Sequence, residues 1–248
     1  MAEVILKTDN LSKKYGFVMA NDHVTLQINK GDIYGFIGVN GAGKTTFMKI
    51  ICDLIRPTEG TFSLMGAASG KELSKVRRKM GVLIEHPALY SDMTALQNLV
   101  IQGRYKDYKP KDGKRTYYDI LDRVGLSDVG NKKVREFSMG MKQRLGLALC
   151  LVGEPEFIIL DEPYVSLDPV GVNDFRKILL QLNKEGVTIL FSCHTLAEMT
   201  KVATRYGFIH KGKLRKEITA EQLELELKEK NEDLEAYFLR HLEEWNNN

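Results

Sequence analysis

The strongest constraint on this 248-residue chain is a phosphate-binding loop motif, Gly38-Val39-Asn40-Gly41-Ala42-Gly43-Lys44-Thr45, which fits the pattern G-x-x-x-x-G-K-[ST]. Its glycines let the backbone curl so that successive N–H groups point inward, and the start of the following helix then faces the phosphates. An apolar strand pattern, Ile33 to Ile37, precedes the motif, and a helical pattern, Thr45 to Leu54, follows it. The motif therefore predicts a nucleotide site. The expected contacts come from Gly38, Asn40, Gly41, Ala42, Gly43, Lys44, Thr45 and Thr46.

Two acidic residues complete this predicted site. Lys44 supplies a point charge toward the outer phosphates, and Thr45 offers a hydroxyl to Mg²⁺. Such a loop needs a Mg²⁺-supporting carboxylate at the tip of a neighbouring buried strand, and Asp161 directly follows the apolar run Phe157 to Leu160. Glu162 comes next, and its side chain faces in a different direction from that of Asp161, so it can polarise the water that attacks the terminal phosphate. We therefore expect ATP and Mg²⁺ to bind here.

Apolar runs and helical patterns alternate along most of the chain. The runs Tyr34 to Ile37, Phe157 to Leu160 and Val187 to Phe191 are nearly continuous in apolar residues, as strands buried on both faces of a parallel sheet are. Helical patterns at Val170 to Lys184 and Leu196 to Thr204 complete an alternation that is typical of a wound α/β sheet. Further strands are expected at Val4 to Thr8, Val24 to Ile28, Thr61 to Leu64, Gly81 to Ile84 and Tyr206 to His210.

The alternation stops between residues 88 and 154, where three or four helical patterns occur with few β signals. We expect an α/β core over residues 1–87 and 155–218, an α-helical subdomain inserted over 88–154, and an acidic helical extension over 219–248. The extension should fold back as one or two amphipathic helices. Its apolar stripe consists of Leu234, Phe238, Leu242 and Trp245.

Composition and charge exclude several classes of protein. With 43% hydrophobic and 28% charged residues the chain is ordinary globular protein, and no apolar run approaches the about 18 to 20 residues of a membrane helix. The first residues do not resemble a secretory signal, so we expect a cytosolic protein. The net charge is +3, but residues 219–248 hold nine acidic and three basic residues, a local −6 that leaves +9 elsewhere. We interpret the basic groups as solvated helical faces or as a docking face for an anionic partner.

With these motifs the chain resembles the ATP-binding subunits of ABC transporters over residues 3–215. The family's second diagnostic element, a serine- and glycine-containing stretch that opens a helix, matches Phe137 to Arg144. Ser138 and the N–H groups at that helix start form an anion site, and Gly140 permits close backbone approach. Met139 and Met141 replace the usual glycine and glutamine. The resemblance implies that two subunits pack head to tail, each presenting this element to the ATP held by the other.

Further matches follow in the family's order. The segment Ser166-Leu167-Asp168 resembles the loop that communicates across the dimer. His194, just past a buried strand, resembles the histidine that contacts the terminal phosphate, and Tyr15 resembles the aromatic residue that stacks on adenine. The resemblance thus implies that Lys44, Glu162 and His194 are catalytic, and that Tyr15, Ser138 and Gly140 help to bind nucleotide.

The family usually has glutamine in the loop that joins the core to the helical subdomain, whereas this chain has Glu85. We expect Glu85 to bind Mg²⁺ with Thr45 and Asp161 when ATP is present. Glu85 and the following Pro87 to Tyr90 are similar to the branch of the family that serves bacitracin and lantibiotic self-protection exporters, and Asp233 to Leu239 also resembles that branch.

The sequence thus predicts an ATP-hydrolysing exporter subunit, a homodimer with ATP at its interface, which powers a separate membrane-spanning permease from the inner face of the cell membrane and binds no nucleic acid. One alternative is a soluble ABC ATPase that acts on nucleic acid or ribosomes through the basic helical region. Such proteins usually carry two cassettes, coiled-coil insertions or zinc-binding cysteines, which this sequence lacks. A second alternative is a regulatory module without turnover, against which Glu162 argues.

Overall fold

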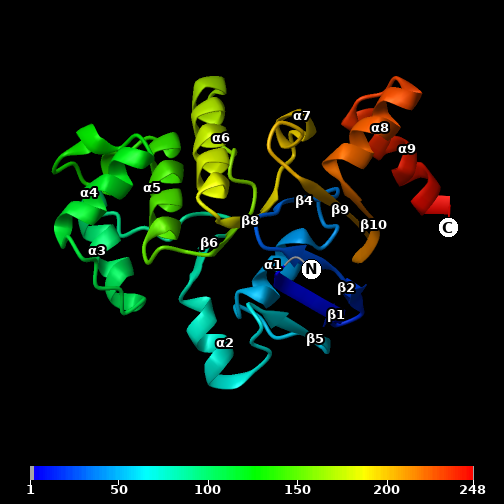
Figure 1. Ribbon diagram of the computed structural model, residues 1–248, viewed down its shortest axis with the longest axis horizontal. Coiled ribbons are helices and arrows are strands. Elements are labelled where there is room, and N and C mark those ends of the chain that lie inside the picture. Colours follow the sequence, from blue (N-terminus) through cyan, green and yellow to red (C-terminus); the bar gives the residue numbers. More distant parts are fainter. Residues whose placement is uncertain (1–2, 248) are drawn as a thin grey trace.

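The computed structural model describes residues 3–247, whose strands form two sheets (Figure 1). Six strands form the larger sheet in the order β10-β9-β4-β8-β7-β6, parallel except for the antiparallel pair β9 and β10. In the smaller, antiparallel sheet, β1 pairs with β2, β3 and β5. The strands are β1 (Val4–Tyr15), β2 (Val18–Val24), β3 (Gln27–Asn29), β4 (Ile33–Ile37), β5 (Glu59–Leu64), β6 (Met80–Leu83), β7 (Phe157–Leu160), β8 (Thr188–Ser192), β9 (Arg205–His210) and β10 (Lys213–Thr219).

Helices follow or cover these strands, and within residues 3–247 none combines the length and apolar character needed to cross a bilayer. Three of them, with two short 3-10 turns, lie between β6 and β7 and form one end of the molecule (green in Figure 1). The helices are α1 (Lys44–Ile51), α2 (Gly70–Arg77), α3 (Ala95–Tyr105), α4 (Lys114–Arg123), α5 (Met139–Leu151), α6 (Pro169–Lys184), α7 (Leu196–Met199), α8 (Ala220–Lys230) and α9 (Leu234–Asn247).

The larger sheet is buried on both faces, which explains its continuous apolar strands. On β7, Phe157 and Ile159 join a core that includes residues of α1 and of the antiparallel sheet, while Ile158 and Leu160 join a second core shared with α5 and α6. The expected parallel arrangement of β4, β7 and β8 is confirmed, with β8 between the other two. Their carboxyl ends therefore meet at one edge of the sheet.

Several expected elements differ from the observed ones. The strand expected at Val24 to Ile28 is wrong, because β2 ends at Val24 and β3 begins at Gln27. The helix expected at Leu196 to Thr204 ends at Met199. Strands β2 and β10 and helix α2 were not expected: β2 and β10 are edge strands that carry many polar residues, so they lack a continuous apolar run.

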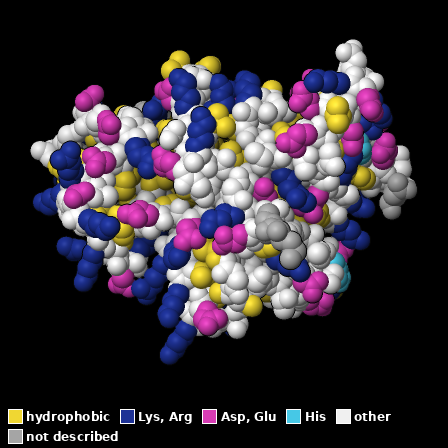
Figure 2. All heavy atoms as spheres, viewed as in Figure 1, with side chains coloured by type: hydrophobic (Ala, Val, Ile, Leu, Met, Phe, Trp, Pro, Cys, Tyr) yellow, Lys and Arg dark blue, Asp and Glu magenta, His cyan; other side chains and the backbone are white. Residues whose placement is uncertain are grey.

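The C-terminal segment folds back on the core as two helices, α8 and α9. Leu234 and Phe238 are buried, and Leu242 and Trp245 pack against the same core, so the expected stripe does face inward. Tyr237, which is not on that stripe, is fully buried as well. Figure 2 shows acidic side chains gathered over α8 and α9, whereas Lys and Arg are interspersed with acidic side chains at the opposite end, over α3 and α4.

Candidate functional site

The phosphate-binding loop connects β4 to α1 and is shaped by close backbone packing. Gly43 begins the helix with φ 107°, and a Cβ there would lie 2.2 Å from the Ala20 carbonyl oxygen. A Cβ on Gly38 would lie 2.5 Å from the Ile209 carbonyl oxygen. Only glycine therefore fits at either position. The loop bounds a cavity of about 160 Å³ that is lined by Ala20, Asn40, Gly41, Ala42, Gly43, Lys44, Thr45, Thr46 and Glu162.

Lys44 is buried inside this loop. Its Nζ donates to the carbonyl oxygen of Gly38 at 2.6 Å and lies 3.3 Å from that of Val39. Burial lowers the pKa of Lys44, and the negative charges of Glu162 and Asp161 oppose that shift. The ammonium group is thus held at the loop by neutral carbonyl groups, which phosphate oxygens, as anionic acceptors, can replace with stronger hydrogen bonds.

Asp161 lies at the carboxyl end of β7 and is almost fully buried. Its two carboxylate oxygens accept hydrogen bonds from separate hydroxyls, Oδ2 from Thr45 and Oδ1 from Ser192, each at 2.6 Å. Ser192 Oγ also accepts from the backbone N–H of Glu162 at 3.0 Å. These contacts join the first turn of α1 to the ends of β7 and β8.

The all-oxygen donors of Thr45 and Asp161 suit Mg²⁺, which usually takes one or two protein ligands and completes its shell with waters and substrate phosphates. Within residues 3–247 no three His, Cys, Asp or Glu side chains form a metal site of their own. The pair fits a cation that arrives with the nucleotide rather than one held in a protein cage.

Glu162 and His194 form a second pair at this edge of the sheet. Nε2 of His194 lies 2.6 Å from Oε2 of Glu162, although the two residues come from different strand ends. Glu162 has φ 54°, a left-handed backbone uncommon for a side chain of this type and often found at functional sites. Burial raises the pKa of Glu162, while the nearby charges of His194 and Lys44 lower it. A carboxyl whose pKa is raised by burial, beside a phosphate-binding loop, is a candidate for proton transfer.

Four other predicted residues lie outside the loop cavity. Tyr15 is half exposed, with Lys13 Nζ 5.1 Å from its ring centroid. Ser138 begins α5 and accepts a hydrogen bond from Met141 N–H, and Gly140 follows in the first turn. Glu85 is exposed and pairs with Lys49 of α1, its Oε1 lying 2.8 Å from Lys49 Nζ. One chain thus assembles Lys44, Thr45, Asp161, Glu162 and His194, but it brings none of these four into the loop cavity.

Sequence reasoning missed two residues of the site. Ser192 ends β8, which pairs with β7. Asp161 was identified as a polar residue at the end of a continuous apolar run, and Ser192 follows such a run in the same way. Asn21 is fully buried and its Nδ2 donates to the carbonyl oxygen of Gly43 at 3.1 Å. Asn21 lies in β2, which the sequence pattern did not reveal, so no signal was available for it.

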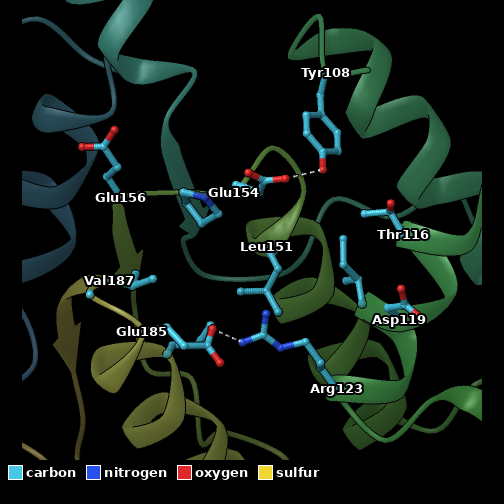
Figure 3. Close-up of a pocket in the computed structure, with 13 residues that line it drawn as sticks. Tyr108, Thr116, Asp119, Arg123, Leu151, Glu154, Glu156, Glu185 and Val187 are labelled. Atoms are coloured by element: carbon cyan, nitrogen blue, oxygen red, sulfur yellow. Dashed lines mark hydrogen bonds and ion pairs between the residues drawn. The ribbon is translucent and has the colours of Figure 1, made fainter. Parts of the chain in front are cut away.

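A different and larger cavity, of about 440 Å³, lies at the other end of the strands (Figure 3). Glu156, just before β7, and Val187, just before β8, line it, and Arg123 pairs with Glu185 across it at 2.6 Å. Ligands of parallel α/β sheets bind at the carboxyl ends of the strands. The loop edge, and not this cavity, is therefore the candidate catalytic site.

The fold and this edge define a phosphate-loop nucleotide triphosphatase. A family model described as "ABC transporter" matches residues 21–165. The chain belongs to the ABC transporter family and is an ATPase of that family.

Known proteins similar to the chain agree with this placement. The bacitracin transport ATP-binding protein of Bacillus licheniformis is 40% identical over 220 residues, which cover 88% of this chain and 71% of that protein. The lantibiotic transport ATP-binding protein of Streptococcus pyogenes is 39% identical over 211 residues, which cover 85% of this chain and 89% of that protein.

Two solved structures have the same fold. An ATP-binding subunit of an ABC transporter superposes with a TM-score of 0.86 at 25% identity, covering 95% of this chain and 98% of the other. A dimeric ATP-binding cassette in a post-hydrolysis state, bound to ADP and Pi, superposes with a TM-score of 0.79 at 26% identity. The superposition covers 87% of this chain and 99% of the other.

Proposed function

We propose that this chain is the ATP-hydrolysing subunit of an exporter that removes antimicrobial peptides, and that it drives a separate membrane-spanning permease from the inner face of the cell membrane. The observation that supports it best is the convergence of the phosphate loop, the Thr45–Asp161–Ser192 contacts and the Glu162–His194 pair at one sheet edge. The substrate class rests on the similarity to bacitracin and lantibiotic transport proteins and on Glu85.

The residues of this edge divide the work of hydrolysis. The N–H groups of the loop and Lys44 bind and orient the outer phosphates, so charge on the transferred phosphoryl group is stabilised. Mg²⁺, held by Thr45 and Asp161 when bound, supplies further charge neutralisation. Glu162 accepts a proton from the attacking water, and its raised pKa makes it a better base than an ordinary carboxylate. His194 orients Glu162 and can donate a hydrogen bond to the terminal phosphate.

The proposed dimer gives Ser138 and Gly140 a role. They begin α5, but they lie outside the cavity of this chain's own phosphate loop. Met139 is exposed beside them, so the helix start is open to a partner. In a head-to-tail homodimer each helix start would meet the ATP on the other subunit. The similar cassette in the post-hydrolysis state is itself dimeric, which supports the proposed assembly. We also propose that residues 88–154, which include α5, form an α-helical subdomain inserted into an α/β core of residues 1–87 and 155–218, with residues 219–248 as a helical extension.

The alternative of an ATPase that acts on nucleic acid or ribosomes finds no support. Several basic residues in and just before the helical region are paired with carboxylates, so part of the positive charge that nucleic acid would need is compensated. Examples are Arg78 with Asp107, Lys79 with Glu156 and Arg135 with Asp92.

Substitution of Glu162 by Gln tests the proposal. Without the base, the ATPase rate should fall about 100-fold or more, because general base catalysis contributes about that much. ATP binding should persist, since the phosphate contacts remain, and size-exclusion chromatography with ATP should show a trapped dimer. Glu229→Gln, on an exposed face of α8, is the matched control and should behave as wild type. An unchanged rate in Glu162→Gln would contradict the proposed role.

A further inference from the structure

Helix α9 is anchored directly beside the strand that leads into the phosphate loop. Phe208 of β9 is the pairing partner of Ile37, the last residue before Gly38. The Phe208 ring stacks on Phe238 of α9, with centroids 6.1 Å apart, and lies 6.2 Å from the ring of Trp245. An aromatic cluster thus fixes α9 to the sheet at the level of the loop.

Polar contacts hold the same helix from its other sides. Tyr237 of α9 donates its hydroxyl to Glu226 of α8 at 2.6 Å, and Arg240 of α9 pairs with Glu232 in the turn between the helices. Near the C-terminal end, Asn246 Oδ1 lies 3.1 Å from Nε2 of the buried His210. These contacts make α9 a fixed part of the fold rather than a loose appendage.

Residues of α9 also enclose the segment that carries His194. Glu235, Phe238 and Leu239 share a cavity of about 410 Å³ with Val39 of the loop and with His194. Helix α7, which begins two residues after His194, lies against α9. Both the phosphate loop and the His194 segment therefore border the same helix.

The segment that follows His194 is held by contacts with its neighbours. Met199 of α7 is fully buried in the core, and Glu198 of α7 pairs with Arg176 of α6 at 2.8 Å. Helix α7 has only four residues, and within the described structure Thr195 gives it no side-chain cap. The His194 side chain is half exposed, and its contact with Glu162 is the ion pair already described. A short helix of this kind depends on packing against its neighbours for its position.

From these contacts we propose that α9 is a positioning element for His194: it fixes α7, and through α7 it sets where His194 lies relative to Glu162 and the phosphate loop. This inference rests on the proposed function. It gives the C-terminal segment a regulatory use, because any partner that displaces α9 lowers turnover without touching the nucleotide.

The test compares Phe238→Ala and Leu239→Ala with the wild-type chain. Both should lower kcat about fivefold or more while the Kd for ATP changes less than about twofold, because α9 acts on the histidine and not on the phosphate contacts. Phe238→Leu should restore most of kcat. Leu239 is half exposed, so Leu239→Ala should fold even if Phe238→Ala does not, and its kcat then tests the inference. Leu225→Ala, on the exposed face of α8, is the control and should leave kcat unchanged.

A double-mutant cycle with His194→Ala separates positioning from general stability. If α9 acts through His194, Leu239→Ala should have no further effect on kcat in the His194→Ala background. The same fold-loss in both backgrounds, or an unchanged kcat in the single variants of an active enzyme, would overturn the inference and leave the proposed function standing. A wild-type chain with no ATPase activity would overturn both.

Discussion

The imidazole Nε2 of His194 lies 2.6 Å from Oε2 of Glu162, while Lys44 and Asp161 act on the same carboxyl through their charges. Burial raises the pKa of Glu162 above its ordinary value of 4.5, and the charges of His194 and Lys44 moderate that shift. The pKa of the proposed base is thus set by burial and by charged groups from three separate segments of the chain, so the ATPase rate should depend on pH.

The pH profile of kcat should report the Glu162 carboxyl. Glu162 must be ionised to accept a proton, so kcat should fall as pH decreases, with a midpoint above 4.5 because the pKa is raised. His194 lowers the pKa of Glu162, so in His194→Ala the residual kcat should show its acid midpoint at higher pH than in wild type. Steady-state ATPase assays from pH 5 to 9 measure this. A midpoint that moves to lower pH in His194→Ala would contradict the assignment.

Ser192 should support Asp161 and the Glu162 backbone. Ser192→Ala removes the hydroxyl that donates to Oδ1 of Asp161, and hydrogen bonds to charged groups contribute about 1.5 to 3 kcal/mol. We expect a lower free energy of unfolding by about that amount and a higher Mg²⁺ concentration for half-maximal ATPase rate. Urea denaturation and Mg²⁺ titration measure the two effects. Ser74→Ala, exposed on α2, should change neither.

Glu85 should matter for coupling more than for nucleotide binding. Its pairing with Lys49 lies on the surface, where such ion pairs contribute about 0 to 1 kcal/mol, so Glu85→Ala should leave stability nearly unchanged. Lys49 lies one turn along α1 from Thr45 and on the same face of the helix, so Glu85 pairs with the helix that carries the proposed Mg²⁺ ligand. Transport in vesicles should fall in Glu85→Ala and persist in Glu85→Gln, which retains the oxygen ligand. Full transport by Glu85→Ala would exclude a coupling role.

The region around Tyr90 should contact the permease. Tyr90 is half exposed at the start of the helical region, and its hydroxyl lies 3.2 Å from that of Tyr105. A cysteine at position 90 should crosslink to the membrane subunit, whereas one at Tyr118 on α4 is the exposed control. Burial raises the pKa of Cys52 and Cys150 to about 12 and that of Cys193 to about 11, so the native thiols should react slowly. Crosslinking equal at both positions would contradict the prediction.

The sequence was informative where structure follows from local patterns. The loop from Gly38 to Thr45 and the acidic residues after Leu160 are recognisable because a buried parallel strand is a continuous apolar run that ends at the site. The role of Asn21 could not be predicted from the sequence, because its strand, β2, is an edge strand with mixed polarity. Its contact with Gly43 also joins residues that are far apart along the chain. The pairing of Glu85 with Lys49 could not be predicted either, because this surface contact depends on how the loop after β6 lies relative to helix α1.

The close packing around Gly38 and Gly43 also bears on how fast the nucleotide binds. The carbonyl oxygens of Ile209 and Ala20 pack so closely against the backbone of Gly38 and Gly43 that a Cβ at either position would lie within 2.5 Å of one of them. We therefore expect the loop to become ordered when the chain folds, so that its conformational entropy is lost then and not when ATP arrives. A receptor that is rigid in advance captures its ligand without a slow rearrangement, so differences in nucleotide affinity among variants of this loop should appear mainly in the dissociation rate.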